Sequence, residues 1–327
     1  MNATMLRLSL PTFLLAAVTA QDSGRPGIDF PVPAYSTGCT FDSTRGALVL
    51  FGGTVPDRGP RAALWSWSSK WAFHASPPTE TPEPRNAPAL AFDAKRGCVV
   101  LFGGDGRSGP LGDTWEWDGT RWQQRATEGP AARTLTRLAY DPERNAVVMF
   151  GGVAGSKVFG DTWTWDGKAW RLLVEQGPPR QLHGMAHDPV RKALFVFGGS
   201  TGVGEPGKAD PALLSGETWT LAKDGWRLVT DQGPGARDHV ALAFDPMSKQ
   251  LLVHGGFDGQ KLRGDTWGFD GKVWKELAKQ AACGDRSFCC LATDTKNKRL
   301  VLFGGFDATG PKNDVWAWGG KDWVVAK

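Results

Sequence analysis

The chain has 327 residues, with 43 glycines, 22 prolines and 16 tryptophans, and it carries a formal net charge of +4. So many turn-forming residues argue against a helical protein and favour an all-β fold. The small net charge, without any run of lysine and arginine, argues against nucleic acid as a partner.

The first twenty residues have the pattern of a secretory signal peptide. Arg7 precedes a mostly apolar stretch over 8–18, and small residues lead to a cleavage point between Ala20 and Gln21. The apolar run is short for a membrane span, and no later segment is apolar enough to cross a bilayer. We therefore expect a soluble, monomeric, secreted or periplasmic protein with an N-terminal extension over 21–33.

From residue 34 onward one motif recurs six times. An apolar run that ends in Gly-Gly, first seen as VLFGG at 49–53, returns at intervals of 51, 48, 47, 57 and 49 residues. An aspartate in a predicted turn precedes each run, at Asp42, Asp93, Asp141, Asp188, Asp245 and Asp294. Two apolar runs joined by a tight turn predict a β-hairpin in every unit.

After each Gly-Gly, a loop leads to a second predicted hairpin that is marked by tryptophans. The first tryptophan of each unit is Trp65, Trp115, Trp163, Trp219, Trp267 or Trp316, and the second is Trp71, Trp122, Trp170, Trp226, Trp274 or Trp323. Four short strands in each of six units predict an all-β, six-bladed β-propeller, because no unit can bury its apolar face alone. The expected blades are 34–80, 81–128, 129–176, 177–232, 233–281 and 282–327.

These units resemble the kelch repeat over nearly all of the mature chain. The kelch pattern has a glycine pair after the second strand, and then an aromatic residue and a tryptophan separated by six positions, as in Trp115 and Trp122. The family usually has tyrosine at the first of those positions, so this chain resembles a divergent, exported bacterial member. The resemblance implies a propeller similar to the central domain of galactose oxidase.

The remaining four tryptophans also occupy repeat positions. Trp67, Trp117, Trp165 and Trp318 each lie two residues after the first tryptophan of their unit. An aromatic residue that every blade requires is best explained by packing between blades. We therefore favour a structural role for the tryptophans over a platform for stacking sugars.

A second repeated feature consists of arginines and acids. Arg85, Arg133, Arg180, Arg237 and Arg286 stand eight residues before the turn aspartates, and Asp113, Asp161, Glu217, Asp265 and Asp314 stand two residues before the first tryptophans. Blade 1 lacks both, with Ala34 and Ala63 in their places. This joint absence predicts structural salt bridges within blades, in which the arginine crosses the Gly-Gly to the acid. A ring of arginines that binds an anion is the alternative.

Irregular positions are better guides to a ligand site than repeated ones. They gather on the face that carries the loops after Gly-Gly and the linkers between blades, which we call the top face. Our candidates for ligand binding are Tyr35, Asn86, Gln181, His183, Asp238 and His239. The alternative is a hydrated funnel without a ligand. The top loop of blade 4, at 200–217, is longer than the others and is expected either to arch over the channel or to be a tolerated insertion.

Metal and cofactor chemistry find little support. His183 and His187 would lie about 13 Å apart on a strand, which is too far to share one ion. A copper-radical oxidase similar to galactose oxidase would need converging tyrosines and histidines, whereas Tyr35 and Tyr140 sit at opposite ends of their strands. We expect no metal and no cofactor.

The five cysteines are an odd number for a chain in an oxidising compartment. Cys39 and Cys290 lie on the inner strands of blades 1 and 6, where a disulfide would latch the ring. Cys283 with Cys289 is the local alternative.

Two functions remain. The first is a non-catalytic module that binds a glycan, a peptide or a protein through its top face. The second is an enzyme acting on a small acidic carbohydrate, by resemblance to the six-bladed kelch epimerase of N-acetylneuraminate. It would need an acid and a base facing one pocket, and His183, His239, Asp238 and Glu205 are the available groups. We favour the binding module.

Overall fold

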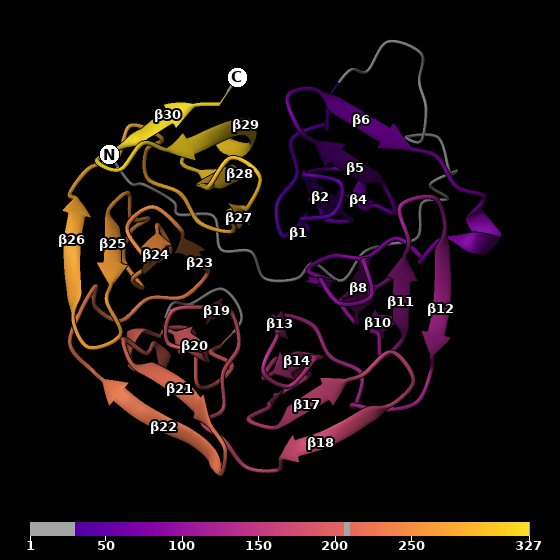
Figure 1. Ribbon diagram of the computed structural model, residues 1–327, viewed down its shortest axis with the longest axis horizontal. Helices are drawn as coiled ribbons and strands as arrows, with labels where there is room; N and C mark the ends of the chain where they lie inside the picture. The colour runs from indigo at the N-terminus through magenta and orange to yellow at the C-terminus, as the bar shows by residue number, and fades with distance from the viewer. Residues whose placement is uncertain (1–29, 206–209, 327) are drawn as a thin grey trace.

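The computed structural model describes residues 30–205 and 210–326. Six sheets stand around a central axis (Figure 1), and each is a four-stranded sheet whose strands follow in chain order from the centre outward. The predicted six-bladed propeller is confirmed. The predicted signal peptide and most of the extension at 21–33 lie outside the described residues. In the described part there is no α-helix, and no helix that could cross a membrane.

The strands are short and regular from blade to blade. Blades 1 and 2 contain β1 (Gly38–Asp42), β2 (Ala47–Phe51), β5 (Leu64–Trp67), β6 (Trp71–His74), β7 (Ala89–Asp93), β8 (Cys98–Phe102), β11 (Thr114–Trp117) and β12 (Trp122–Ala126). Blades 3 and 4 contain β13 (Arg137–Asp141), β14 (Ala146–Phe150), β17 (Thr162–Trp165), β18 (Trp170–Val174), β19 (Gly184–Asp188), β20 (Ala193–Phe197), β21 (Thr218–Ala222) and β22 (Gly225–Thr230). Blades 5 and 6 contain β23 (Ala241–Asp245), β24 (Gln250–His254), β25 (Thr266–Phe269), β26 (Trp274–Ala278), β27 (Cys290–Asp294), β28 (Arg299–Asp307), β29 (Gly310–Trp318) and β30 (Trp323–Val325).

Short ribbons extend the top loops of the first three blades. They pair β3 (Thr54–Val55) with β4 (Gly59–Pro60), β9 (Asp105–Gly106) with β10 (Gly109–Pro110), and β15 (Val153–Ala154) with β16 (Lys157–Val158). Two 3-10 turns, η1 (Pro78–Glu80) and η2 (Pro211–Leu213), lie in the connection from blade 1 to blade 2 and in the top loop of blade 4.

The repeated aspartate begins the turn between the two inner strands. In blade 1, the Oδ1 atom of Asp42 accepts the backbone N–H groups of Thr44 at 3.0 Å and Arg45 at 2.9 Å. The turn ends at Gly46, whose φ of 64° favours glycine. This turn sets the register in which Asp42 pairs with Ala47.

The Gly-Gly pair lets two blades approach closely. Gly52 and Gly53 have φ angles of 72° and 88°, and the backbone N–H of Gly53 donates to the carbonyl of Arg85 in blade 2 at 3.0 Å. A Cβ atom on Gly52 would lie 2.7 Å from that same carbonyl oxygen. Glycine is therefore required here both for its conformation and for the contact between blades.

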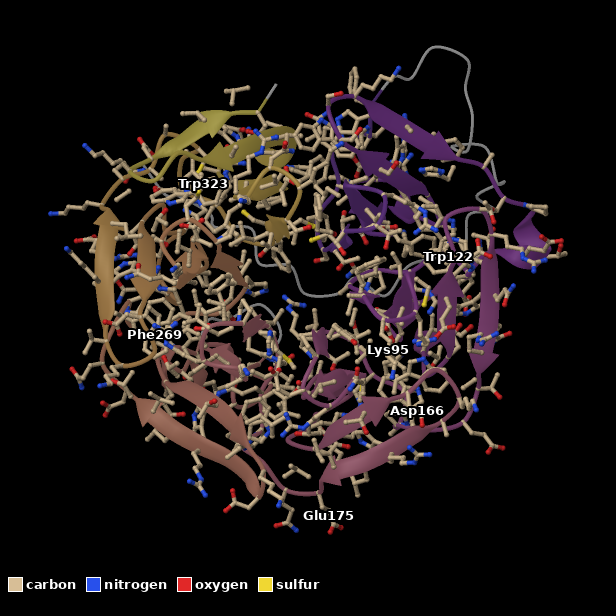
Figure 2. The ribbon with its side chains drawn as sticks, viewed as in Figure 1. Lys95, Trp122, Asp166, Glu175, Phe269 and Trp323 are labelled. Atoms are coloured by element: carbon tan, nitrogen blue, oxygen red, sulfur yellow. The ribbon has the colours of Figure 1, made fainter. Side chains whose placement is uncertain are left out.

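The second tryptophan of each blade packs against the preceding blade. Trp122 meets Phe51 with ring centroids 5.2 Å apart. The same contact closes the ring, because Trp71 of blade 1 meets Phe303 of blade 6 at 5.1 Å. Trp122 and Trp323 lie within the body of the molecule, whereas Glu175 lies at its perimeter (Figure 2). These contacts support the structural role that we expected for the repeated tryptophans.

Side chains, rather than a shared strand, join the first and last blades. All four strands of blade 6 come from one continuous segment, 290–325, and its innermost strand β27 contacts β1. Across this seam, the thiol of Cys290 donates to the carbonyl of Thr37 at 3.3 Å. The Nδ2 atom of Asn313 donates to the carbonyl of Pro31 at 3.1 Å, so residue 31 is attached to the last blade.

Candidate functional site

Each repeated arginine lies against the acid of its own blade. Arg85 donates from Nη1 to Asp113 Oδ1 at 2.7 Å and from Nη2 to Asp113 Oδ2 at 2.9 Å. It also donates to the carbonyl of Gly103, and thus crosses the glycine pair as expected. The other pairs are Arg133–Asp161, Arg180–Glu217, Arg237–Asp265 and Arg286–Asp314. Because all five arginines are buried and paired, they do not form a ring of free cations at the mouth.

The first tryptophan of each blade completes this pair. The indole N–H of Trp115 donates to Asp113 at 2.6 Å, and the equivalent tryptophans of blades 3 to 6 do the same. Burial alone would raise the pKa of Asp113, but the hydrogen bonds and charge of Arg85 and the indole of Trp115 outweigh it. The pKa of Asp113 therefore lies below its ordinary value, and the carboxylate stays ionised.

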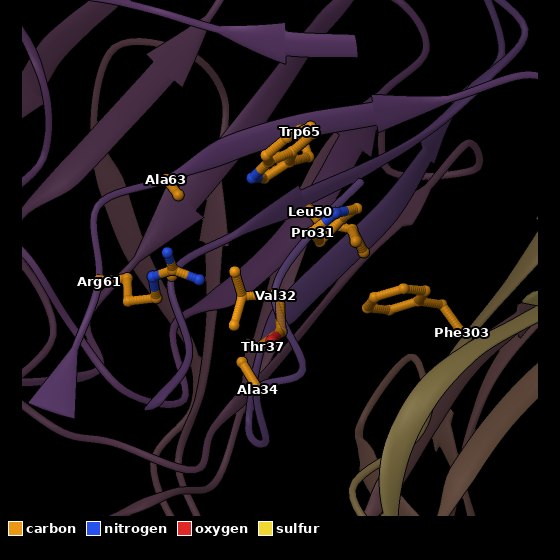
Figure 3. Close-up of a pocket in the computed structure, with 10 residues that line it drawn as sticks. Pro31, Val32, Ala34, Thr37, Leu50, Arg61, Ala63, Trp65 and Phe303 are labelled. Carbon is orange, nitrogen blue, oxygen red and sulfur yellow. The ribbon is translucent and has the colours of Figure 1, made fainter. Parts of the chain in front are cut away.

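Blade 1 has a small cavity close to its missing pair. Ala34 and Ala63 line it together with Val32 and Trp65, and Phe303 of blade 6 faces it (Figure 3). Its volume is about 20 Å³, which is room for one water molecule. This cavity is too small for an organic ligand.

The mouth of the central channel is built from the linkers between blades. Six residues there, one in each blade, have a left-handed backbone with φ between 46° and 58°: Ser36, Ala87, Leu135, Leu182, His239 and Phe288. The residue before each of them forms a β-bridge with the residue that follows the Gly-Gly. Backbone hydrogen bonds join several neighbours around the mouth, such as Ala87 N–H to Ser36 O at 2.9 Å. The linkers thus form a narrow inner ring on the top face.

Blades 1, 5 and 6 bring an aromatic and polar cluster together on this ring. The ring centroid of Phe288 lies 4.0 Å from that of His239 and 6.1 Å from that of Tyr35, and Tyr35 also meets Phe306 at 6.0 Å. His239 Nδ1 lies 2.5 Å from Asp238 Oδ1. Tyr35, His239 and Phe288 are partly exposed, and burial raises the pKa of Tyr35. We call Tyr35, Asp238, His239, Phe288 and Phe306 the mouth cluster.

Three of the candidate residues are not part of the mouth cluster. Gln181 is buried, and its Nε2 atom donates to the carbonyl of Gly202, which holds the start of the blade 4 loop. The side-chain oxygen of Asn86 is buried and has no partner among the described residues. His183 is fully buried against Phe150, and neither of its ring nitrogens has a described partner, so it is not available to a ligand at the mouth.

The described part of the blade 4 loop leans toward blade 5. Asp210 caps the 3-10 turn η2 by accepting the N–H of Ala212 at 3.1 Å. Pro211 and Leu214 lie close to Gly259 in the top loop of blade 5, because a Cβ on that glycine would lie 3.0 Å from Pro211. The loop therefore has one anchor at Gln181 and a second one at blade 5.

All five cysteines are free thiols, which corrects the predicted disulfide between Cys39 and Cys290. These two thiols do lie at the same seam and interact with each other, and the hydrogen bond with Cys39, together with burial, raises the pKa of Cys290. Cys283 contacts His254 Nε2 at 3.3 Å instead of pairing with Cys289. The seam is therefore held by packing and hydrogen bonds.

One group of possible metal ligands occurs on the bottom face. Atoms of Asp141, Glu143 and His187 lie within 4.8 Å of one another. Asp141 already accepts the N–H of Glu143 at 3.0 Å and pairs with Arg144 at 2.5 Å, and His187 Nε2 lies 2.9 Å from Glu143. These contacts account for the group as a turn with an ion pair.

Comparison with known proteins supports the fold and leaves the family open. The chain is similar to a solved structure described as "Structure of YjhT", with a TM-score of 0.68 and 14% sequence identity, over 91% of this chain and 99% of that one. At this identity the similarity concerns the fold alone. No family model and no curated protein matches the sequence, so kelch membership stays a prediction.

Proposed function

We propose that this protein is a non-catalytic binding module that works outside the cytoplasm as a monomer and holds a glycan at the mouth of its channel. The mouth cluster is the observation that carries the proposal. It combines partly exposed rings with hydrogen-bonding groups, and it comes from irregular positions rather than from the repeat. Apolar ring faces beside a few directed polar groups are typical of small-ligand sites.

The positions of the candidate acids and bases favour binding over catalysis. The enzyme hypothesis needs an acid and a base that face one pocket. Among the described residues, His183 is buried away from the mouth, Glu205 lies on the exposed loop, and Asp238 is engaged by the adjacent His239. The groups available for acid–base chemistry thus do not converge on a closed pocket.

A glycan array followed by titration of the best binder tests the proposal. Phe288→Ala and His239→Ala should each weaken binding at least tenfold, which corresponds to about 1.4 kcal/mol. Met247→Ala, at an exposed site in a bottom turn, is the matched control and should bind like the wild type. Absence of any glycan ligand, or equal binding by all variants, would contradict the proposal.

A second assay separates the two functions. Mutarotation of N-acetylneuraminate, followed by NMR, should proceed at the same rate with and without the protein. A faster rate that is lost in His239→Ala would favour the enzyme.

A further inference from the structure

The inner strand of blade 3 carries an arginine that belongs to none of the five repeated pairs. Arg137 is the first residue of β13, four residues after Arg133. The equivalent residues of the other blades are small, namely Gly38, Ala89, Gly184, Ala241 and Cys290. Because β13 is the innermost strand of its sheet, Arg137 places a long cationic side chain where the other blades leave space.

The guanidinium of Arg137 interacts electrostatically with residues of three other blades. Burial, together with the charges of Arg137 and Arg180, holds the pKa of His183 in blade 4 well below its ordinary value. Arg137 also interacts with the thiols of Cys39 in blade 1 and Cys290 in blade 6. Together with the place of Arg137 on the innermost strand, these interactions indicate that its side chain extends toward the central axis.

Arg137 has no counter-charge among the described residues. Among the described residues, its guanidinium makes a single hydrogen bond, from Nη1 to the carbonyl of Thr136 at 3.3 Å, although it offers five N–H donors. It is half-buried, and burial lowers its pKa. The five repeated arginines, in contrast, are each paired with an acid. A half-buried cation without a counter-charge loses part of its hydration without compensation, and a bound anion offsets that loss.

Two acids at the ends of the channel, Asp238 and Asp141, are already engaged. Asp238 at the mouth contacts His239 at 2.5 Å. Asp141 ends the same strand as Arg137, about 13 Å away, and it pairs with Arg144. Neither acid is therefore a counter-charge of Arg137.

We propose that the central channel binds a small oxyanion on Arg137. The planar guanidinium matches two oxygen atoms of a carboxylate, a phosphate or a sulfate group. We assign its entry to the side of Ser36 and Ala87, because these residues carry the smallest side chains of the inner ring. In the described structure no backbone hydrogen bond links Ala87 to Leu135 there. An anion of a few atoms enters by this side.

Crystals of the full chain soaked in selenate give a direct test. Selenate has the shape and charge of sulfate, and its anomalous signal should show a selenium atom with oxygens about 2.9 Å from the guanidinium of Arg137. The signal should be absent in Arg137→Met. No selenate in the channel, or the same site in Arg137→Met, would overturn the proposal.

A solution assay identifies the anion class and controls for folding. Titration with phosphate, sulfate and acetate at constant ionic strength should show binding to the wild type and to Arg107→Met, which removes an exposed arginine from the top face. Arg137→Met should bind at least tenfold more weakly, and Arg137→Lys should keep part of the affinity. Acetate as the tightest ligand would identify a carboxylate site, and phosphate or sulfate an inorganic one. Equal binding by Arg137→Met and Arg107→Met, or no binding of any of the three anions, contradicts the proposal. Because the mouth cluster is unchanged in these variants, failure here leaves the glycan proposal intact.

Discussion

Breaking one buried pair should cost far more than removing the pair altogether. Arg237 and Asp265 are the most buried of the five pairs, with side chains 1% and 4% exposed. Arg237→Met leaves the Asp265 carboxylate with only the Trp267 indole at 2.8 Å and Arg263 at 3.7 Å. An uncompensated buried charge costs about 3–5 kcal/mol, so we expect a loss of unfolding free energy in that range.

The double variant Arg237→Met/Asp265→Leu should be more stable than Arg237→Met alone. It removes both charges and leaves three polar groups without their partner: the carbonyls of Gly255 and Pro234 and the indole of Trp267. Each of these groups costs about 1–3 kcal/mol, but the two carbonyls already lose their partner in Arg237→Met, so the double variant only exchanges the stranded carboxylate for a stranded indole. Blade 1, which lacks both charges, shows that a blade folds without the pair.

Urea unfolding at pH 7, followed by tryptophan fluorescence and circular dichroism, measures both variants. Arg286→Met serves as a graded control, because Asp314 is 36% exposed and can regain water. Its cost should fall below that of Arg237→Met. Additive costs in the double variant, or equal costs for Arg237→Met and Arg286→Met, would refute the reasoning.

Three further predictions follow from single positions. Burial holds the pKa of His254 at about 3, below the ordinary 6.5. As the pH falls, the unfolded chain therefore binds this proton at a higher pH than the folded chain does. The contribution of His254 to the free energy of unfolding should be fully present above pH 6.5 and should fall by about 1.4 kcal/mol per pH unit toward pH 3. His254→Phe, which restores the residue of the other blades, should remove this contribution, and an unchanged difference between pH 7 and pH 5 in urea unfolding would contradict it. Gly103→Ala should destabilise by about 3 kcal/mol or more, since its Cβ would lie 2.5 Å from a backbone oxygen of blade 3. Gly59→Ala, also at positive φ but with open space, should cost about 1–2 kcal/mol in the same assay. Alkylation in denaturant without reductant, read by mass spectrometry, should label both Cys39 and Cys290, whereas an unlabelled pair would restore the disulfide latch.

The period of the sequence was enough to predict the architecture. Gly-Gly, the turn aspartate and the tryptophans recur because each blade must make the same contacts, so their spacing gives strand number and blade number directly. Blade 1 has Ala34 and Ala63 where the other blades have an arginine and an acid. This joint absence predicted that the arginine and the acid of one blade pair with each other. Such inferences succeed where one physical constraint is repeated six times.

The mouth cluster was predictable only in part. Tyr35, Asp238 and His239 stand out as irregular polar residues, but Phe288 gave no signal, because nothing in its neighbours marks a left-handed backbone. Its contact with Tyr35 joins residues at opposite ends of the chain, and only ring closure sets their distance. His183 was misleading for a related reason: its polar type suggested a site, whereas its surroundings bury it.

Hydrogen exchange with and without a glycan ligand tests the central claim most directly. If the repeated residues serve cohesion and the irregular mouth serves recognition, slower exchange on binding should be confined to the linkers at 35–36, 238–239 and 287–288. Protection that appears instead in the bottom turns, or on the outer strands, would contradict this division of the molecule.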